Sequence, residues 1–324
     1  MKKLIHIKYR ILRFFIKIFI VLLLIPVAYN FIPVHMGKST FYIPSSDIDT
    51  VIDTLHKNGY GVSLIDKLLL RFVETPEKGW YTLDETPAKR FKFFKTLQAS
   101  RAKTMRVKLY AGETSEELTK RLANDLKLDH RKLLLQYRSQ TKYLEGDIFS
   151  GRYIIARKAD EKAVITALFQ MSKKKLNEFG LQFCGGTPNP LELKILLIIA
   201  SIIQKETNNK HEMYLVSSVI QNRLDRGMKL QMDGTLNYGK HAHKAVTSKR
   251  IRQDKSYYNT YKHGGIPPAP LATVSIDALK AALNPKKTDY LFFMLNRKGK
   301  HDFASTYKEH IRNIKAFKQK SKKS

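Results

Sequence analysis

A single carboxylate, Glu206, follows a long apolar stretch over residues 191–203. This stretch predicts a helix, and Ile202, Ile199 and Ile195 precede the acid at helical spacing on one face. Burial over this apolar face and the negative end of the helix dipole both disfavour the charged carboxylate. We therefore expect a carboxyl group with a raised pKa that can donate a proton near pH 7. The alternative is a surface acid in the fraying last turn of the helix.

Polar and aromatic residues after Glu206 are candidates for binding a sugar. Residues 229–233 alternate like a half-buried strand, which would place Lys229, Gln231 and Asp233 on one face. The further candidates are Thr235, Tyr238, Tyr258, Asn259 and Tyr261. Aromatic rings stack on the apolar faces of sugars, while amides and hydroxyls bind their hydroxyl groups. For any one of these residues, an ordinary polar loop with a core tyrosine is the alternative.

Other catalytic chemistries have weaker signals in this sequence. His241 and His243 are two residues apart in a loop without a convincing third ligand, so a metal site is not predicted. There is no G-x-S-x-G nucleophile motif, and the single cysteine, Cys184, has no placed partner. Neither a metal nor an organic cofactor is implied.

The N-terminal residues predict a membrane anchor. A basic tail over residues 1–13 precedes an apolar segment over residues 14–35, which reaches the roughly 20 residues needed to cross a bilayer. A cleaved signal peptide is the alternative, but no small-x-small site closes the apolar run. The basic flank lies on the N-terminal side, so we expect a single-pass protein in the inner membrane with its C-terminal body in the periplasm.

The net charge of +31 raises the question of nucleic-acid binding. The lysines and arginines are spread along the whole chain, and no helix-turn-helix, zinc finger or aromatic–basic RNA motif is present. An outward-facing body would rarely meet nucleic acid. Anionic lipid headgroups and the carboxylates of cell-wall stem peptides are the expected counter-charges, and nucleic acid is not an expected partner.

The body divides into two predicted parts, residues 36–180 and 181–320. Strand–turn–helix patterns begin near residues 39 and 104 and suggest a weak internal repeat, although two unrelated units are the alternative. Thr114 and Glu117 predict a capping box at the second helix. Residues 180–190 are glycine- and proline-rich and predict a linker. At its end, Asn189 and Pro190 predict the start of the helix that carries Glu206.

Motifs over residues 190–310 resemble those of the MltG/YceG-like endolytic murein transglycosylases. In chain order they are residues 200–207 (ASIIQKET), 221–224 (QNRL), 228–233 (MKLQMD) with Thr235, 258–261 (YNTY), 266–268 (IPP), 284–285 (NP), 290–293 (YLFF), and His301 with Phe303. The sequence departs from this family at several positions, among them Gly234, where the family usually has proline, and Ala269 and Val274.

The resemblance implies an α+β fold with a small LysM-like module before a mixed α+β catalytic domain. It implies a lyase that cleaves the bond between N-acetylmuramic acid and N-acetylglucosamine inside glycan strands, leaves 1,6-anhydro ends and limits nascent strand length. Glu206 would be catalytic, and His301 joins the substrate-binding candidates. The implied partners are peptidoglycan strands, the inner membrane and peptidoglycan synthases. A hydrolase of the same bond, with Asp233 or Glu212 as base, and a non-catalytic wall-binding scaffold are the alternatives.

Overall fold

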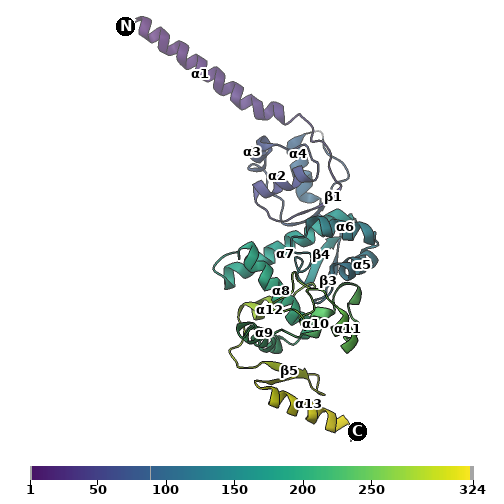
Figure 1. Ribbon diagram of the computed structural model, residues 1–324. Helices are drawn as coiled ribbons and strands as arrows, with labels where there is room; N and C mark the ends of the chain where they lie inside the picture. The colour runs from purple at the N-terminus through teal and green to yellow at the C-terminus, as the bar shows by residue number, and fades with distance from the viewer. Residues whose placement is uncertain (1, 88, 322–324) are drawn as a thin grey trace. The chain divides into compact units, whose positions relative to one another are not determined.

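The computed structural model describes residues 2–87 and 89–321 as a mixed α+β protein (Figure 1). The chain divides into two compact units, residues 1–106 with 154–167 and residues 107–153 with 168–324. The predicted boundary between residues 180 and 181 falls inside the second unit.

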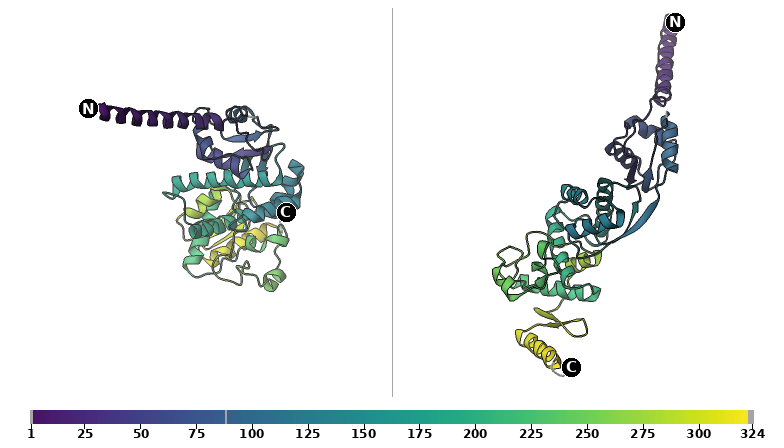
Figure 2. Two further views of the ribbon diagram at one scale, coloured as in Figure 1. Left: turned by 90° about the horizontal axis from the view of Figure 1, so that it is seen from above. Right: turned by 90° about the vertical axis from the view of Figure 1, so that its right-hand side faces the viewer.

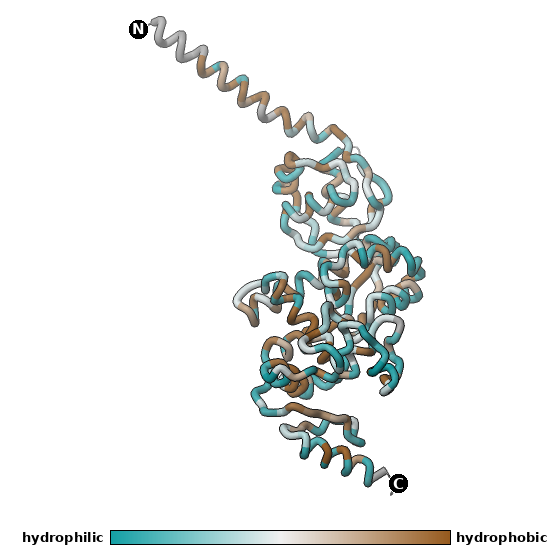
Figure 3. The backbone as a smooth tube through the Cα atoms, in the orientation of Figure 1, coloured by the Kyte–Doolittle hydropathy of each residue, from teal (hydrophilic) through white to brown (hydrophobic). Residues whose placement is uncertain are grey.

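The first unit begins with a long apolar helix. Its elements are α1 (Lys2–Tyr29), β1 (Thr40–Ile43), α2 (Ile48–Lys57), α3 (Leu64–Leu70), β2 (Gly79–Thr82) and α4 (Arg90–Ala99). Helix α1 is continuous in every view, and hydrophobic residues predominate along the part of it that Figure 3 colours (Figures 2 and 3). From Ile11 to Tyr29 it is long and apolar enough to cross a membrane, and large side chains such as Phe14, Phe15 and Phe19 are more than half exposed. This segment lies within the predicted anchor.

A small α+β core follows α1. Strands β1 and β2 pair antiparallel, with Phe41 opposite Tyr81, and α2 and α3 connect them. Phe41, Tyr81, Phe93 and Leu97 are almost completely buried in this core. The predicted strand near residue 39 and the helix after it are confirmed, and they belong to a strand–helix–helix–strand arrangement.

Three elements begin in one unit and end in the other: β3 (Thr104–Leu109), β4 (Gly151–Ala156) and α7 (Glu161–Phe183). Strands β3 and β4 form a two-stranded sheet, and α5 (Ser115–Leu126) and α6 (His130–Gln140) lie between them in the chain. The Thr114–Glu117 capping box predicted for α5 is present. The order strand–helix–helix–strand therefore occurs twice in the chain.

The second unit surrounds one buried helix. Its remaining elements are α8 (Pro190–Glu206), α9 (Lys210–Asp225), α10 (Asp233–Leu236), the 3-10 helix η1 (Gly239–His241), α11 (Ser248–Gln253), α12 (Ile276–Leu283), β5 (Phe292–Leu295), β6 (His301–Ala304) and α13 (Tyr307–Ser321). Helix α8 contacts α9, α10 and α12 (Figure 1). The side chain of Asn189 caps its N-terminus and Pro190 occupies its first turn, as predicted. A helix that is apolar on most sides is stable only when neighbours cover it.

Two local predictions were wrong. The segment 180–190 is not a linker from its first residue, because α7 continues to Phe183. Gly180 lies inside that helix, where an added Cβ would meet the carbonyl oxygen of Gly186 at 2.6 Å, so this glycine permits close packing. Residues 229–232 form no strand, since Gln231 adopts a left-handed φ of 50° that interrupts the alternation.

A buried ion pair in the first unit leads to a stability prediction. Nη1 of Arg90 donates to Oδ2 of Asp66 at 2.7 Å, and their side chains are 6% and 0% exposed. The Arg90→Met substitution should lower the free energy of unfolding by about 3 kcal/mol or more, because it leaves a buried carboxylate without its cation. Denaturant unfolding followed by the fluorescence of Trp80, the single tryptophan, measures this in the unit concerned.

The exposed pair Lys57–Asp53 provides the control. The Lys57→Met substitution removes the same charge and should change the free energy of unfolding by less than about 0.5 kcal/mol. Equal effects of the two substitutions would contradict the importance of the buried pair.

Candidate active site

Glu206 is the last residue of α8 and is half-buried. Its Oε1 accepts a hydrogen bond from the backbone amide of Gly234 at 3.1 Å. Ile202, one turn earlier, is completely buried and Ile199 is half-buried, but Ile195 is 40% exposed. The apolar face predicted from the sequence is therefore buried only in the last turns of the helix, next to the acid.

Burial raises the pKa of Glu206 to about 7. The neighbouring charge of Asp233 raises this pKa further, whereas the Gly234 amide and the charge of His301 lower it. Lys205, the preceding residue, donates from its ammonium group to the carbonyl oxygen of Gly112 at 2.7 Å. The raised pKa predicted from the sequence is thus confirmed, and burial is its main cause.

The start of α10 lies against Glu206. An added Cβ on Gly234 would meet Cβ of Lys205 at 2.7 Å and Oε1 of Glu206 at 2.9 Å, so the close approach depends on glycine here. The preceding residue, Asp233, is exposed, and its Oδ1 accepts a hydrogen bond from the Tyr261 hydroxyl at 2.7 Å. The structure therefore brings Glu206, Asp233 and Tyr261 together although they are far apart in the sequence.

Thr235 and Asn259 are buried and bond to protein atoms rather than to solvent. The hydroxyl of Thr235 contacts that of Thr260 at 2.9 Å and donates to the carbonyl oxygen of Met232 at 2.7 Å. The amide of Asn259 donates to the carbonyl oxygens of Ile251 and Asp254, at 2.9 and 2.8 Å. These hydrogen bonds fix the segments that carry the neighbouring site residues.

Tyr238 and Tyr258 form an aromatic wall. Their rings stack with centroids 4.7 Å apart and an interplanar angle of 22°. Both rings and Thr235 line a cleft of about 710 Å³ that extends along α11. Thr235 directly follows Gly234, whose amide contacts Glu206, but Glu206 itself does not line this cleft. A half-buried pair of stacked rings suits the apolar face of a sugar.

His301 and Gln231 have different surroundings. Nδ1 of His301 lies 2.7 Å from Oε2 of Glu212, and its backbone amide donates to Oε1 of the same carboxylate at 3.1 Å. Thr207 also donates to Glu212, at 3.1 Å. The side chain of Gln231 is exposed and its Oε1 is 3.5 Å from Nη1 of Arg223. His301 therefore has a carboxylate partner, Glu212. The side chain of Gln231 is accessible to solvent.

Helix α9 fixes the strands and loops that carry these groups. The guanidinium of Arg223 donates to the carbonyl oxygens of Leu230 and Leu291, at 2.6 and 2.7 Å. The amide of Asn222 donates to the carbonyl oxygens of Thr288 and Tyr290, at 2.7 and 2.9 Å. Two adjacent residues of one helix thereby fix both the segment that precedes Asp233 and the segment that precedes β5.

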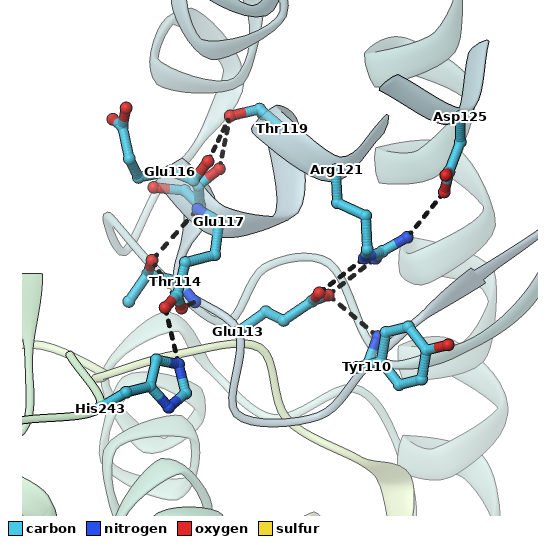
Figure 4. Close-up of polar contacts among 10 residues, drawn as sticks. Tyr110, Glu113, Thr114, Glu116, Glu117, Thr119, Arg121, Asp125 and His243 are labelled. Carbon is cyan, nitrogen blue, oxygen red and sulfur yellow. Dashed lines mark hydrogen bonds and ion pairs between the residues drawn. The ribbon is translucent and has the colours of Figure 1, made fainter. Parts of the chain in front are cut away.

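Figure 4 shows a polar cluster around Glu117 and Arg121, which were not among the residues predicted for the site. Glu117 receives hydrogen bonds from the amide and hydroxyl of Thr114, and Nε2 of His243 lies 2.7 Å from its Oε1. Burial opposes ionisation of Glu117, but these hydrogen bonds and the charges of His243 and Lys205 keep the pKa of Glu117 below its usual value. Arg121 forms ion pairs with both Glu113 and Asp125. The pairing of Glu117 with His243, which join distant parts of the chain, has no signal in the local sequence.

A model of the YceG-like family matches residues 41–316. The chain belongs to this family. Over 122 residues it is 38% identical to an endolytic murein transglycosylase of Bacillus subtilis, which covers 38% of this chain and 34% of that protein. Over 177 residues it is 30% identical to an endolytic murein transglycosylase of Streptococcus pneumoniae, which covers 53% of this chain and 32% of that protein. The matched region is thus about a third of the length of these curated relatives.

The fold also resembles a solved structure. The crystal structure of a putative YceG-like protein from Listeria monocytogenes matches with a TM-score of 0.54 and 24% sequence identity, and the match covers 86% of this chain and 99% of that one. The mixed α+β architecture is therefore shared with another member of the family.

The raised pKa of Glu206 leads to a prediction about stability. Between about pH 4.5 and 7 the folded protein keeps a proton on Glu206 that the unfolded chain has lost, so this group makes stability fall as the pH rises. Glu206→Gln removes this effect. The variant should therefore gain up to about 3 kcal/mol in free energy of unfolding relative to the wild type across that range.

Urea unfolding followed by circular dichroism at a series of pH values measures the difference. Glu178→Gln is the matched control, because Glu178 is exposed on α7 and lies outside the site. It shows how much of the effect comes from replacing a carboxylate outside the site. A constant difference for Glu206→Gln would show that Glu206 ionises normally in the folded protein.

Proposed function

We propose that this chain is a membrane-anchored endolytic murein transglycosylase, a lyase that cleaves glycan strands of peptidoglycan internally. The observation that carries the proposal is Glu206, a half-buried carboxyl group with a pKa of about 7, whose Oε1 accepts a hydrogen bond from the amide of Gly234. Such an acid holds a transferable proton near neutral pH and can also act as a base after giving it up. The names of the relatives from Bacillus subtilis and Streptococcus pneumoniae support the same reaction.

In the proposed mechanism Glu206 acts twice. Its protonated carboxyl donates to the glycosidic oxygen between N-acetylmuramic acid and N-acetylglucosamine while the bond from that oxygen to C1 of the muramic acid breaks. The resulting carboxylate then accepts the proton of the muramic C6 hydroxyl, whose oxygen bonds to C1. The product has a 1,6-anhydro end, water is not consumed, and Glu206 regains its proton. A second carboxylate is therefore not required, in contrast to most glycoside hydrolases.

We assign the surrounding residues to two roles. The exposed Gln231 and Asp233, the half-buried Tyr238, Tyr258 and Tyr261, and His301 would contact the sugar. The buried Thr235 and Asn259 would act by positioning their neighbours. The hydrogen bond from Tyr261 to Asp233 keeps that carboxylate beside Glu206, where its charge favours the protonated acid.

We further propose that the two strand–helix–helix–strand arrangements are LysM-like modules that hold glycan strands. Helix α1 would anchor the protein in the cytoplasmic membrane, with the body on the outer side and, in an organism with an outer membrane, in the periplasm. Peptidoglycan synthases would supply the nascent strands whose length this cleavage limits. The basic charge of the body suits anionic lipid headgroups and the carboxylates of stem peptides.

A hydrolase that cleaves the same bond is the second candidate, and the position of Asp233 favours it. The charge of Asp233 acts on Glu206, and in a hydrolase this exposed carboxylate would be the candidate to activate water. Glu212 is a weaker base because His301 and Thr207 already occupy its oxygens. Masses of the products from purified peptidoglycan separate the two reactions, since hydrolysis adds one water per cleavage and the lyase leaves anhydro ends.

Glu206→Gln should reduce cleavage of purified glycan strands by at least about a hundredfold, because it removes the transferable proton. For the wild type, kcat/KM should fall as the pH rises through about 7, where the protonated acid is lost. Product release measured by chromatography at a series of pH values tests both statements. Glu178→Gln should retain wild-type rates, and a folded Glu206→Gln protein that keeps most of its activity would refute the catalytic assignment.

The proposed topology has its own test. A reporter enzyme that is active only outside the cytoplasm, fused after Ser324, should be active, and the mature protein should retain α1. Moving the same reporter in front of residue 1 should abolish its activity. If a shortened, soluble protein without α1 is the main product, α1 is a cleaved signal peptide instead.

A further inference from the structure

The cleft beside Tyr238 and Tyr258 has a basic wall that the proposed mechanism does not use. This wall is α11, from which Lys249 and Arg250 line the cleft. One carboxylate, Asp254, also lines it, and its Oδ1 accepts a hydrogen bond from the amide of Ser256 at 2.8 Å. His241, from η1, completes the titratable groups that face this space.

Arg250 is unusual among these groups. Its Nε and Nη1 are shielded from solvent, and within the described part of the chain they have no hydrogen-bond partner. A buried donor without an acceptor is costly, and charged donors are the most costly. An acceptor that enters the cleft and reaches these donors would remove this cost.

The position of Arg250 is well defined. Thr247 caps the start of α11 through the backbone amide of Arg250, and the buried side chain of Asn259 binds carbonyl oxygens at the end of the helix. Asn259 stands between Tyr258 and Thr260, in the segment that also carries Tyr261. The basic wall is thus tied to the same loop as the residues near Glu206.

We infer that Arg250 binds a carboxylate on the side arm of the glycan substrate while the sugar lies against Tyr238 and Tyr258. A guanidinium donates two parallel hydrogen bonds to a carboxylate, which a lysine cannot reproduce. The substrate class follows from the proposed function, on which this inference rests. Muramic acid carries its side arm as a lactyl group, and that arm ends either in a free carboxylate or in a stem peptide with carboxylates of its own.

Binding of soluble disaccharide-peptide monomers to the full-length protein in detergent, measured by calorimetry, tests the inference. Arg250→Gln should weaken binding of the native monomer about tenfold, in line with a charge-assisted pair. A monomer whose carboxylates have been converted to amides should bind the wild type and Arg250→Gln equally weakly. Arg250→Lys should restore only part of the affinity.

Arg252→Gln is the matched control. It removes the same charge from the same helix, but Arg252 is exposed and does not line the cleft.

The disaccharide without its peptide keeps only the lactyl carboxylate and identifies which carboxylate Arg250 binds. A tenfold effect of Arg250→Gln on this ligand assigns the lactyl group. An effect confined to the peptide form assigns the stem peptide.

Three results would overturn the inference: no measurable binding of the native monomer, equal losses for Arg250→Gln and Arg252→Gln, or undiminished binding of the amidated monomer.

Cleavage assays on long strands separate a failure of this inference from a failure of the proposed function. If the wild type cleaves nothing but binds monomers as described, the transglycosylase proposal fails and the carboxylate site remains. If it cleaves, Arg250→Gln should raise KM about tenfold on native strands and leave kcat unchanged.

Discussion

Burial of the last turns of α8 is the constraint on which the site depends. The helix is covered by α9, α10 and α12, and Ile202 and Ile203 are fully enclosed just before the chain reaches Glu206. A carboxyl group placed at the end of such a helix loses part of its hydration, which raises its pKa to about 7. The packing that stabilises this unit thus also prepares the acid, because moving α10 away would admit water to Glu206. Stability and acid strength are two consequences of one arrangement.

The loops around Glu206 obtain their order from buried polar side chains rather than from sheets. Arg223 and Asn222 bind carbonyl oxygens of the segments before Asp233 and β5, while Asn259 binds those of α11. Each of these groups would be expensive to bury without partners, and each has them. A site built on irregular segments can in this way be as well positioned as one built on strands. The accessible residues, Gln231 and Asp233 among them, are then free to contact a substrate.

The sequence predicted the elements whose signals are local. The start of α8 at Asn189 and Pro190 and the Thr114–Glu117 capping box follow from residues within a few turns of each other. The raised pKa of Glu206 was predicted from the apolar residues before it, but the burial that causes it also depends on the helices packed around α8. The failures have non-local causes. The left-handed Gln231 interrupts an apparent strand, and the helix that contains Gly180 continues to Phe183, with Gly186 packed close to that glycine. The pairing of Glu117 with His243 and the shielded guanidinium of Arg250 depend on segments brought together only by the fold.

The surroundings of Glu206 act on its pKa in both directions, and burial is the largest effect. Burial and the charge of Asp233 favour the protonated form that the proposed mechanism uses first. The Gly234 amide and His301 favour the carboxylate that it uses second. Gly234 stands where the family that the chain resembles usually has proline, and a proline has no amide hydrogen to donate. Glycine supplies that donor and leaves room for the carboxylate, since even one added carbon would contact Oε1. In this chain the balance between acid and base therefore rests in part on a residue without a side chain.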